Sequence, residues 1–172
     1  MSHHSPTPPA ASALAVGAFP GAMLALDLGQ QTGWALACPR GPITSGTELF
    51  KASRFEGGGM PLLRFVRWLS ELHDHAGPLT AVVFEEVRAH RGTAAAHTYG
   101  AFLGQLTAWC EHYQIPYQGV PVGTIKKDAT GKGNAGKAEV IAAMRAQGFD
   151  PADDNEADAL ALLQWALKGG AR

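Results

Sequence analysis

Several carboxylates interrupt stretches of sequence that are otherwise apolar. Asp27 lies inside an apolar run that reads as a strand buried on both faces, and Glu85 and Glu86 close a second such run. Asp154 and Asp158 flank the start of an apolar helix near the C-terminus. Burying a carboxylate is costly unless a cation or a set of hydrogen bonds compensates for its lost hydration. These positions therefore predict a polar site.

Oxygen ligands without a cluster of His or Cys favour a hard cation, so Mg²⁺ or Mn²⁺ is expected rather than Zn²⁺. Asp154 and Asp158 are four residues apart on one helical face, where a cation between them would reverse their repulsion. Two such ions roughly 3.5–4 Å apart are typical of enzymes that hydrolyse phosphodiesters by in-line displacement. The carboxylates thus predict metal-dependent phosphodiester chemistry.

Structural roles for the same residues are the alternative. Asp27 could cap the turn that contains Gly29, and Asp153 with Glu156 three residues later has the pattern of a capping box. Adjacent strand residues face opposite sides of a sheet. One of Glu85 and Glu86 is therefore expected at the site and the other in solvent.

A basic, glycine-rich segment is predicted as a loop over Lys126–Lys137. Its residues 131–138 resemble a phosphate-binding P-loop, but Ala138 replaces the hydroxyl residue that would hold Mg²⁺, and no buried strand precedes it. No nucleotide cofactor is therefore expected. Glycines and lysines together describe a loop that can follow a phosphate backbone, or a merely solvated charged loop.

Alternating and helical patterns predict an α/β fold. Strands are expected at residues 23–28, 34–38, 43–50, 80–85 and 115–120, the last near a sheet edge because of Pro116. Helices are expected from Pro61, over 93–113, over 138–146 and from Asp154 to about Leu167. Three strands followed by α/β units predict a mixed sheet flanked by helices.

Bulk properties exclude some classes of protein. The 172 residues suffice for one domain, expected over 21–172 after a disordered Ser-, Pro- and Ala-rich leader at 1–20. A net charge of −1 argues against a strongly cationic, sequence-blind nucleic-acid binder. No apolar stretch is long enough to span a membrane, and the two cysteines, without metal-ligand spacing, suggest a reducing, cytoplasmic setting.

The motifs resemble those of the RuvC-like Holliday junction resolvases, most closely the phage and prophage type, within the ribonuclease H-like superfamily. The resemblance covers about residues 23–167. Asp27-Leu28-Gly29 through Gly33-Trp34-Ala35 resembles the family's first strand and hairpin. Phe84-Glu85-Glu86-Val87 resembles its glutamate strand, and Glu156-Ala157-Asp158-Ala159-Leu160 its acidic C-terminal helix.

This resemblance implies a homodimer that cuts four-way DNA junctions with two Mg²⁺ or Mn²⁺ ions and leaves 5′-phosphate and 3′-hydroxyl ends. It implies catalytic roles for Asp27, Glu85, Asp154, Asp158, Lys126 and Lys137. The fourth metal ligand is either Asp154 or Asn155, since Asn155 stands where the family has an acidic residue or His. The predicted DNA contacts are Arg88, His90, Arg91, Lys126, Lys127, Lys132 and Lys137.

The long helix over 93–113 carries Ala96, Gly100 and Gly104 at four-residue spacing. Such a small-residue stripe suits tight packing on the sheet, or a contact between the two subunits of a dimer. Two other functions remain open: an RNA-processing nuclease of the same fold, and a catalytically silent protein that binds DNA junctions.

Overall fold

The computed structural model describes residues 21–88 and 92–170. The predicted leader lies outside these residues, as do His90 and Arg91, so the structure does not locate those two predicted DNA contacts. Within the described part of the chain, no helix is both long and apolar enough to cross a membrane.

A five-stranded mixed sheet forms the centre of the fold. Its strands are β1 (Ala22–Asp27), β2 (Gln31–Ala37), β3 (Thr44–Leu49), β4 (Leu79–Glu86) and β5 (Tyr117–Pro121), in the spatial order β3-β2-β1-β4-β5. The first three strands pair antiparallel, whereas β4 runs parallel to both β1 and β5. The predicted mixed sheet is confirmed, and β5 lies at its edge.

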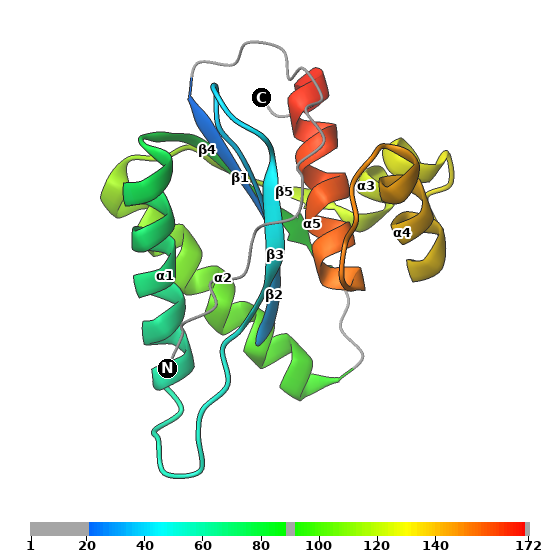
Figure 1. The fold of residues 1–172 in the computed structure, drawn as a ribbon. Coiled ribbons are helices and arrows are strands. Elements are labelled where there is room, and N and C mark those ends of the chain that lie inside the picture. The colour runs from blue at the N-terminus through cyan, green and yellow to red at the C-terminus, as the bar shows by residue number, and fades with distance from the viewer. Residues whose placement is uncertain (1–20, 89–91, 171–172) are drawn as a thin grey trace, which may run out of the picture.

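Helices cover both faces of this sheet (Figure 1). They are α1 (Met60–Ala76), α2 (Thr93–Tyr113), α3 (Val122–Thr130), α4 (Lys137–Ala146) and α5 (Asp154–Trp165), followed by the irregular helical segment η1 (Ala166–Gly170). Helices α1 and α2 lie on one face, and α3, α4 and α5 lie on the other (Figure 1).

The predicted loop over Lys126–Lys137 is wrong in its first part, because residues 122–130 form α3. Pro121 precedes this helix, and Ile125, with Ala129 four residues later, supplies the apolar side that packs against α5. Gly131 ends the helix with φ of 81°, a left-handed conformation that glycine adopts without strain. The glycine-rich connection is therefore only the short stretch between Gly131 and Gly136.

Strand β2 also begins earlier than predicted, at Gln31 instead of Trp34. Gln31 pairs with Leu49 of β3, and the Phe50 N–H donates to the Gln30 carbonyl (2.6 Å). Tertiary pairing thus converts residues 31–33 of the turn predicted over 29–33 into strand, and leaves residues 28–30 as a tight connection directly after Asp27.

Candidate active site

The pleat of the sheet decides which carboxylates can meet. Ala25 and Val83 belong to the core beneath α5, and side chains alternate along a strand, so Asp27 and Glu85 face α5 as well. Strands β1 and β4 are parallel neighbours, with Leu26 aligned to Phe84, so the two carboxylates are adjacent. Glu86 lies on the opposite face and pairs with Arg88 (3.1 Å). The structure therefore brings Glu85, rather than Glu86, to Asp27.

A missing side chain at Gly33 lets α5 approach Asp27. Gly33 is the cross-strand partner of Asp27 in β2. A Cβ at this position would lie 1.9 Å from the backbone oxygen of Asn155, which no packing arrangement tolerates. The first turn of α5 thus rests directly on the backbone of β2, and the acidic residues of this turn lie next to the carboxyl end of β1.

Hydrogen bonds from β3 fix the start of α5. The Thr47 hydroxyl donates to Asp153 (2.8 Å), and the Ser45 hydroxyl donates to Glu156 (2.6 Å). Asp153 caps the helix by accepting the Glu156 N–H (2.9 Å). The second hydrogen bond of the predicted capping box, from the Asp153 N–H to the Glu156 carboxylate, is wrong. That carboxylate accepts the N–H of Ala152 instead (2.8 Å).

The clustered carboxylates resist ionisation. Burial, followed by repulsion from Glu85, Asp158 and Asp154, raises the pKa of Asp27 to about 8. Burial and repulsion from Asp158 raise the pKa of Glu85 to about 7. Burial likewise raises the pKa of Asp158 to about 6. Such shifts mean that the three acidic side chains share a partly desolvated space in which negative charge is in excess.

Two lysines oppose this negative charge from the neighbouring helices. Lys126 of α3 lowers the pKa values of Glu85 and Asp158 through its positive charge. Lys137, the first residue of α4, donates a short hydrogen bond to Asp154 and holds the pKa of that carboxyl below its usual value. Its charge also lowers the pKa of Asp27. The arrangement therefore joins a carboxylate cluster to cations that can meet a phosphate.

The donor chemistry of this cluster fits a hard divalent cation, because oxygen atoms from Asp27, Glu85 and Asp158 share an excess of negative charge. As the side chains stand, no three His, Cys, Asp or Glu residues in the described chain lie close enough together to hold a metal ion. Asp154 lies at the rim of the cluster, and Asn155 lies against Gly33.

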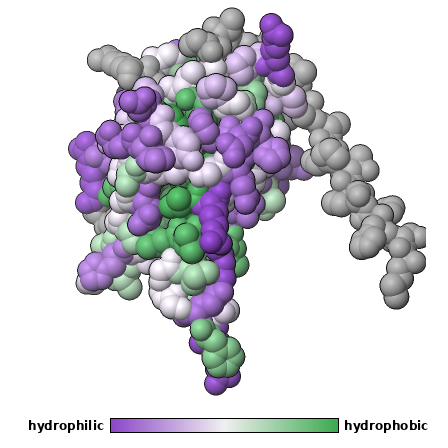
Figure 2. Space-filling view, turned by 90° about the vertical axis from the view of Figure 1, so that its left-hand side faces the viewer, coloured by the Kyte–Doolittle hydropathy of each residue, from purple (hydrophilic) through white to green (hydrophobic). Residues whose placement is uncertain are grey.

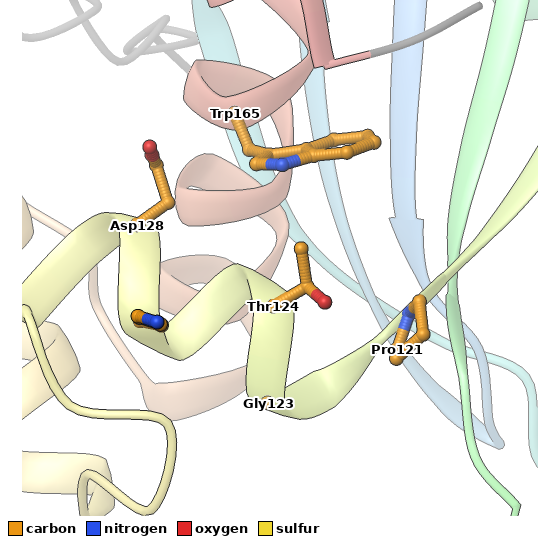
Figure 3. A pocket seen from close by; sticks show the side chains of 6 residues that line it. Pro121, Gly123, Thr124, Asp128 and Trp165 are labelled. Carbon is orange, nitrogen blue, oxygen red and sulfur yellow. The ribbon is translucent and has the colours of Figure 1, made fainter.

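Other predicted DNA contacts are spread over the surface. Lys132 pairs with Glu139 (3.1 Å), and Arg88 is held by Glu86. Lys127 lines a separate open cavity of about 560 Å³ between α3 and α5 (Figure 3). Trp165 covers one side of this cavity, opposite Thr124 (Figure 3). Arg88, Lys127 and Lys132 thus lie apart from the carboxylate cluster beside which Lys126 and Lys137 lie.

Sequence reasoning missed one residue beside the cluster. The Tyr99 hydroxyl of α2 donates to the backbone carbonyl of Glu85 (2.9 Å) and accepts the Val87 N–H (3.4 Å). Tyr99 also lines a cavity of about 380 Å³ next to Leu28 and Gly29, which directly follow Asp27. It thereby positions the end of β4. Only its position as the seventh residue of the helix that follows the glutamate strand could have indicated this role.

The small-residue stripe of α2 does not pack on the sheet as one interpretation predicted. Gly100 and Gly104 are exposed, and a Cβ at either position would meet no atom of the described chain within 4 Å. The side of α2 that contacts the sheet is instead formed by large residues such as Phe102 and Leu106. A subunit contact through Ala96, Gly100 and Gly104 stays a prediction.

Comparison with solved structures places this architecture among known folds, whereas a scan of protein-family models and a search of curated proteins gave no match. RuvC of Thermus thermophilus in complex with a Holliday junction substrate has a TM-score of 0.72 and 24% identity, over 87% of this chain and 94% of that chain. A second Thermus thermophilus RuvC structure has a TM-score of 0.68 and 25% identity, over 87% of this chain and 95% of that one.

A more distant match is the yeast mitochondrial Holliday junction resolvase, with a TM-score of 0.58 and 13% identity, over 87% of this chain and 81% of that chain. The fold is therefore the ribonuclease H-like fold. Within it, the predicted resemblance to RuvC-type Holliday junction resolvases is confirmed.

Proposed function

We propose that this protein is a metal-dependent endonuclease that resolves four-way DNA junctions. The observation that carries the proposal is that Asp27, Glu85 and Asp158, from three separate elements, lie near enough for their charges to interact, with Lys126 and Lys137 beside them. The fold shared with RuvC-type resolvases, one of them bound to a Holliday junction, supports branched DNA as the substrate. The products are a 5′-phosphate and a 3′-hydroxyl.

Asp27, Glu85 and Asp158, completed by Asp154 or Asn155, would hold two Mg²⁺ or Mn²⁺ ions. Bound there, such ions supply Lewis acidity and an activated water nucleophile for phosphodiester hydrolysis. The pKa values of about 8, 7 and 6 for the three carboxyls support this assignment. Groups that repel one another in this way gain most from a cation placed between them.

Lys126 and Lys137 contribute the positive charge that the carboxylates lack. Lys137 exchanges its bond to Asp154 for a phosphate oxygen when DNA enters, while Lys126 remains near Glu85 and Asp158. Each ammonium group then balances negative charge as it develops on the phosphate. Lys127, Lys132, Arg88, His90 and Arg91 contact flanking phosphates in the same proposal.

Two symmetric cuts require two active sites, so we infer a homodimer that uses the exposed side of α2. Gly100 and Gly104 lie in this surface, and the absence of side chains there lets a second helix come close. A dimer of the free protein is measurable by sedimentation, and Gly100→Trp is expected to shift it towards monomer.

The direct test is cleavage of a synthetic four-way DNA junction in Mg²⁺ or Mn²⁺. Linear duplex of the same sequence and an RNA–DNA hybrid serve as substrate controls, and Asp27→Asn as the protein control. Paired symmetric nicks in the junction alone, lost in Asp27→Asn with binding retained, are the expected result. Junction binding without cutting would identify a silent binding protein instead, and cutting of RNA or of the hybrid would identify an RNA-processing nuclease.

A further inference from the structure

The loop between β3 and α1 holds an aromatic side chain out in water. Phe55 is 92% exposed, more than any other large hydrophobic residue of the described chain. The guanidinium carbon of Arg54 lies 5.7 Å from the centre of its ring. The loop projects from the body of the molecule at the bottom of Figures 1 and 2, with apolar and hydrophilic surface side by side.

One exposed phenylalanine needs no explanation by itself, but this one sits on a turn that is held in place. The Glu56 carboxylate accepts the Ser53 N–H (2.8 Å) and a short bond from the Arg64 guanidinium. Arg64 also donates to the Lys51 carbonyl (3.1 Å), and the Glu56 N–H donates to the Ser53 carbonyl (3.2 Å). Arg54 and Phe55 therefore stand at the tip of a closed turn whose shape is set in advance.

The topology places this turn at the end of the sheet where the carboxylates lie, which is the carboxyl-terminal end of β1. Strand β3 is antiparallel to β2, and β2 is antiparallel to β1. The carboxyl-terminal ends of β3 and β1 therefore lie at the same end of the sheet. Gly33 pairs with both Asp27 and Thr47, which puts Thr47 about 10 Å from Asp27 across two strand spacings. Phe55 follows Thr47 by eight residues, and a fully extended chain of that length spans at most about 30 Å.

The charges around the turn suit a polyanion. Residues 51–67 contain four basic residues and one acidic residue, although the whole chain has a net charge of −1. Lys51, Arg54 and Arg67 are exposed, whereas the single acid, Glu56, is used inside the turn. An aromatic ring beside a guanidinium group is the combination on which nucleobases stack while the cation meets the adjacent phosphate.

We propose that the Arg54–Phe55 turn is a second nucleic-acid contact, in which Phe55 stacks on an unpaired or unstacked base near the branch point. Arg54 binds the neighbouring phosphate. The inference rests on the proposed function, since a four-way junction offers such bases close to the cleaved strands and a continuous duplex does not. It gives the enzyme a means of preferring branched DNA that is separate from the carboxylates.

The test uses 2-aminopurine, a base whose fluorescence reports stacking, placed next to the crossover of a four-way junction and in a single strand. Binding is measured without divalent metal, so that no cleavage is needed. Wild-type protein is expected to change the fluorescence of the junction, and Phe55→Ala to lose this change and bind about 5- to 100-fold more weakly. Phe55→Trp should restore both, and Arg54→Gln should lower the log–log salt slope by about one.

Leu49→Ala is the matched control. Leu49 is also apolar and exposed (66%) at this end of the sheet, but it lies on strand β3 and outside the Arg54–Phe55 turn. It should bind within about twofold of wild type. Equal junction binding by Phe55→Ala and wild type would overturn the inference. So would a change in the sedimentation of the free Phe55→Ala protein at unchanged DNA affinity, which would make the turn a protein contact.

Failure of the proposed function gives a different pattern. If the protein neither cuts nor prefers the junction, yet Phe55 still governs the fluorescence change on single-stranded 2-aminopurine DNA, base stacking stands and junction resolution does not. If wild-type protein changes the fluorescence of neither probe, the inference fails whatever the cleavage assay shows.

Discussion

The two faces of the sheet are built from different side chains. Beneath α1 and α2 the core is aromatic, with contacts among the rings of Phe50, Phe65, Trp68 and Phe102. Beneath α5 the strands and the helix contribute many alanines, such as Ala25, Ala35, Ala157 and Ala161, beside leucines and valines. Large rings fill space and bury apolar area, whereas small side chains let backbones come close. Both faces are buried, but the face beneath α5 also brings acidic residues from distant parts of the chain together.

Loss of a single charge on the alanine-rich face is expected to have the largest effect. Asp27→Asn keeps the volume of the side chain but removes a proposed metal ligand, so cleavage of a four-way junction should fall by about 10³- to 10⁴-fold. Glu86→Gln, one residue from Glu85 on the aromatic face, should change the rate by less than about threefold. Equal losses in the two variants would contradict the assignment of faces.

Truncation on the aromatic face should affect folding rather than chemistry. Phe65 is fully buried, and Phe65→Ala should lower the free energy of unfolding by about 3–5 kcal/mol through lost transfer energy and a cavity. Urea unfolding measures the loss. The cleavage rate of the protein that remains folded at low temperature should stay within a few-fold of wild type, and a selective collapse of activity would show that the faces are not independent.

Adding one methyl group between β2 and α5 should separate the carboxylates. Gly33→Ala forces the start of α5 away from Asp27, and a displacement of about 1 Å can cost about 10²-fold in rate. Gly41→Ala is the control, because a Cβ there meets no atom of the described chain within 4 Å. If Gly33→Ala cleaves junctions at the wild-type rate, the close approach of α5 is not what builds the site.

The pH dependence of stability should reveal the carboxylates without any assay of cleavage. The pKa values of Asp27, Glu85 and Asp158 are raised to about 8, 7 and 6 in the folded protein, from 3.8, 4.5 and 3.8. The folded state therefore binds more protons than the unfolded state between these limits. The contribution of these three carboxyl groups to the free energy of unfolding is complete below about pH 4 and is lost as the pH rises to about 8.

Metal-free protein should accordingly have a melting temperature a few degrees lower at pH 8 than at pH 5.5, and Mg²⁺ should raise it more at pH 8. Asp27→Asn should show a smaller pH dependence, because the group with the most strongly raised pKa is gone. A melting temperature of the metal-free protein that rises over this range would contradict the raised pKa values.

Local patterns were sufficient to predict most elements, since β1, β4 and α2 are long apolar or periodic runs. They failed at α3, where lysines and glycines conceal the apolar pair Ile125 and Ala129. They also indicated which carboxylates could do chemistry. Strand alternation predicted that only one of Glu85 and Glu86 faces the site, and the family resemblance selected Glu85. The docking of α5 on Gly33 could not be predicted, because it depends on a contact between residues far apart in the chain.

The hydrogen bonds that tie α5 to β3 also bear on when the proposed nuclease centre can form. Thr47 and Asp153 are separated by 106 positions in the chain, and Ser45 and Glu156 by 111. Contacts between such distant positions close large loops, and proteins rich in such contacts fold slowly. A nascent chain that has emerged only as far as β5 thus carries Asp27 and Glu85 but has no Asp158, so the proposed centre stays incomplete until the last helix is synthesised and docked.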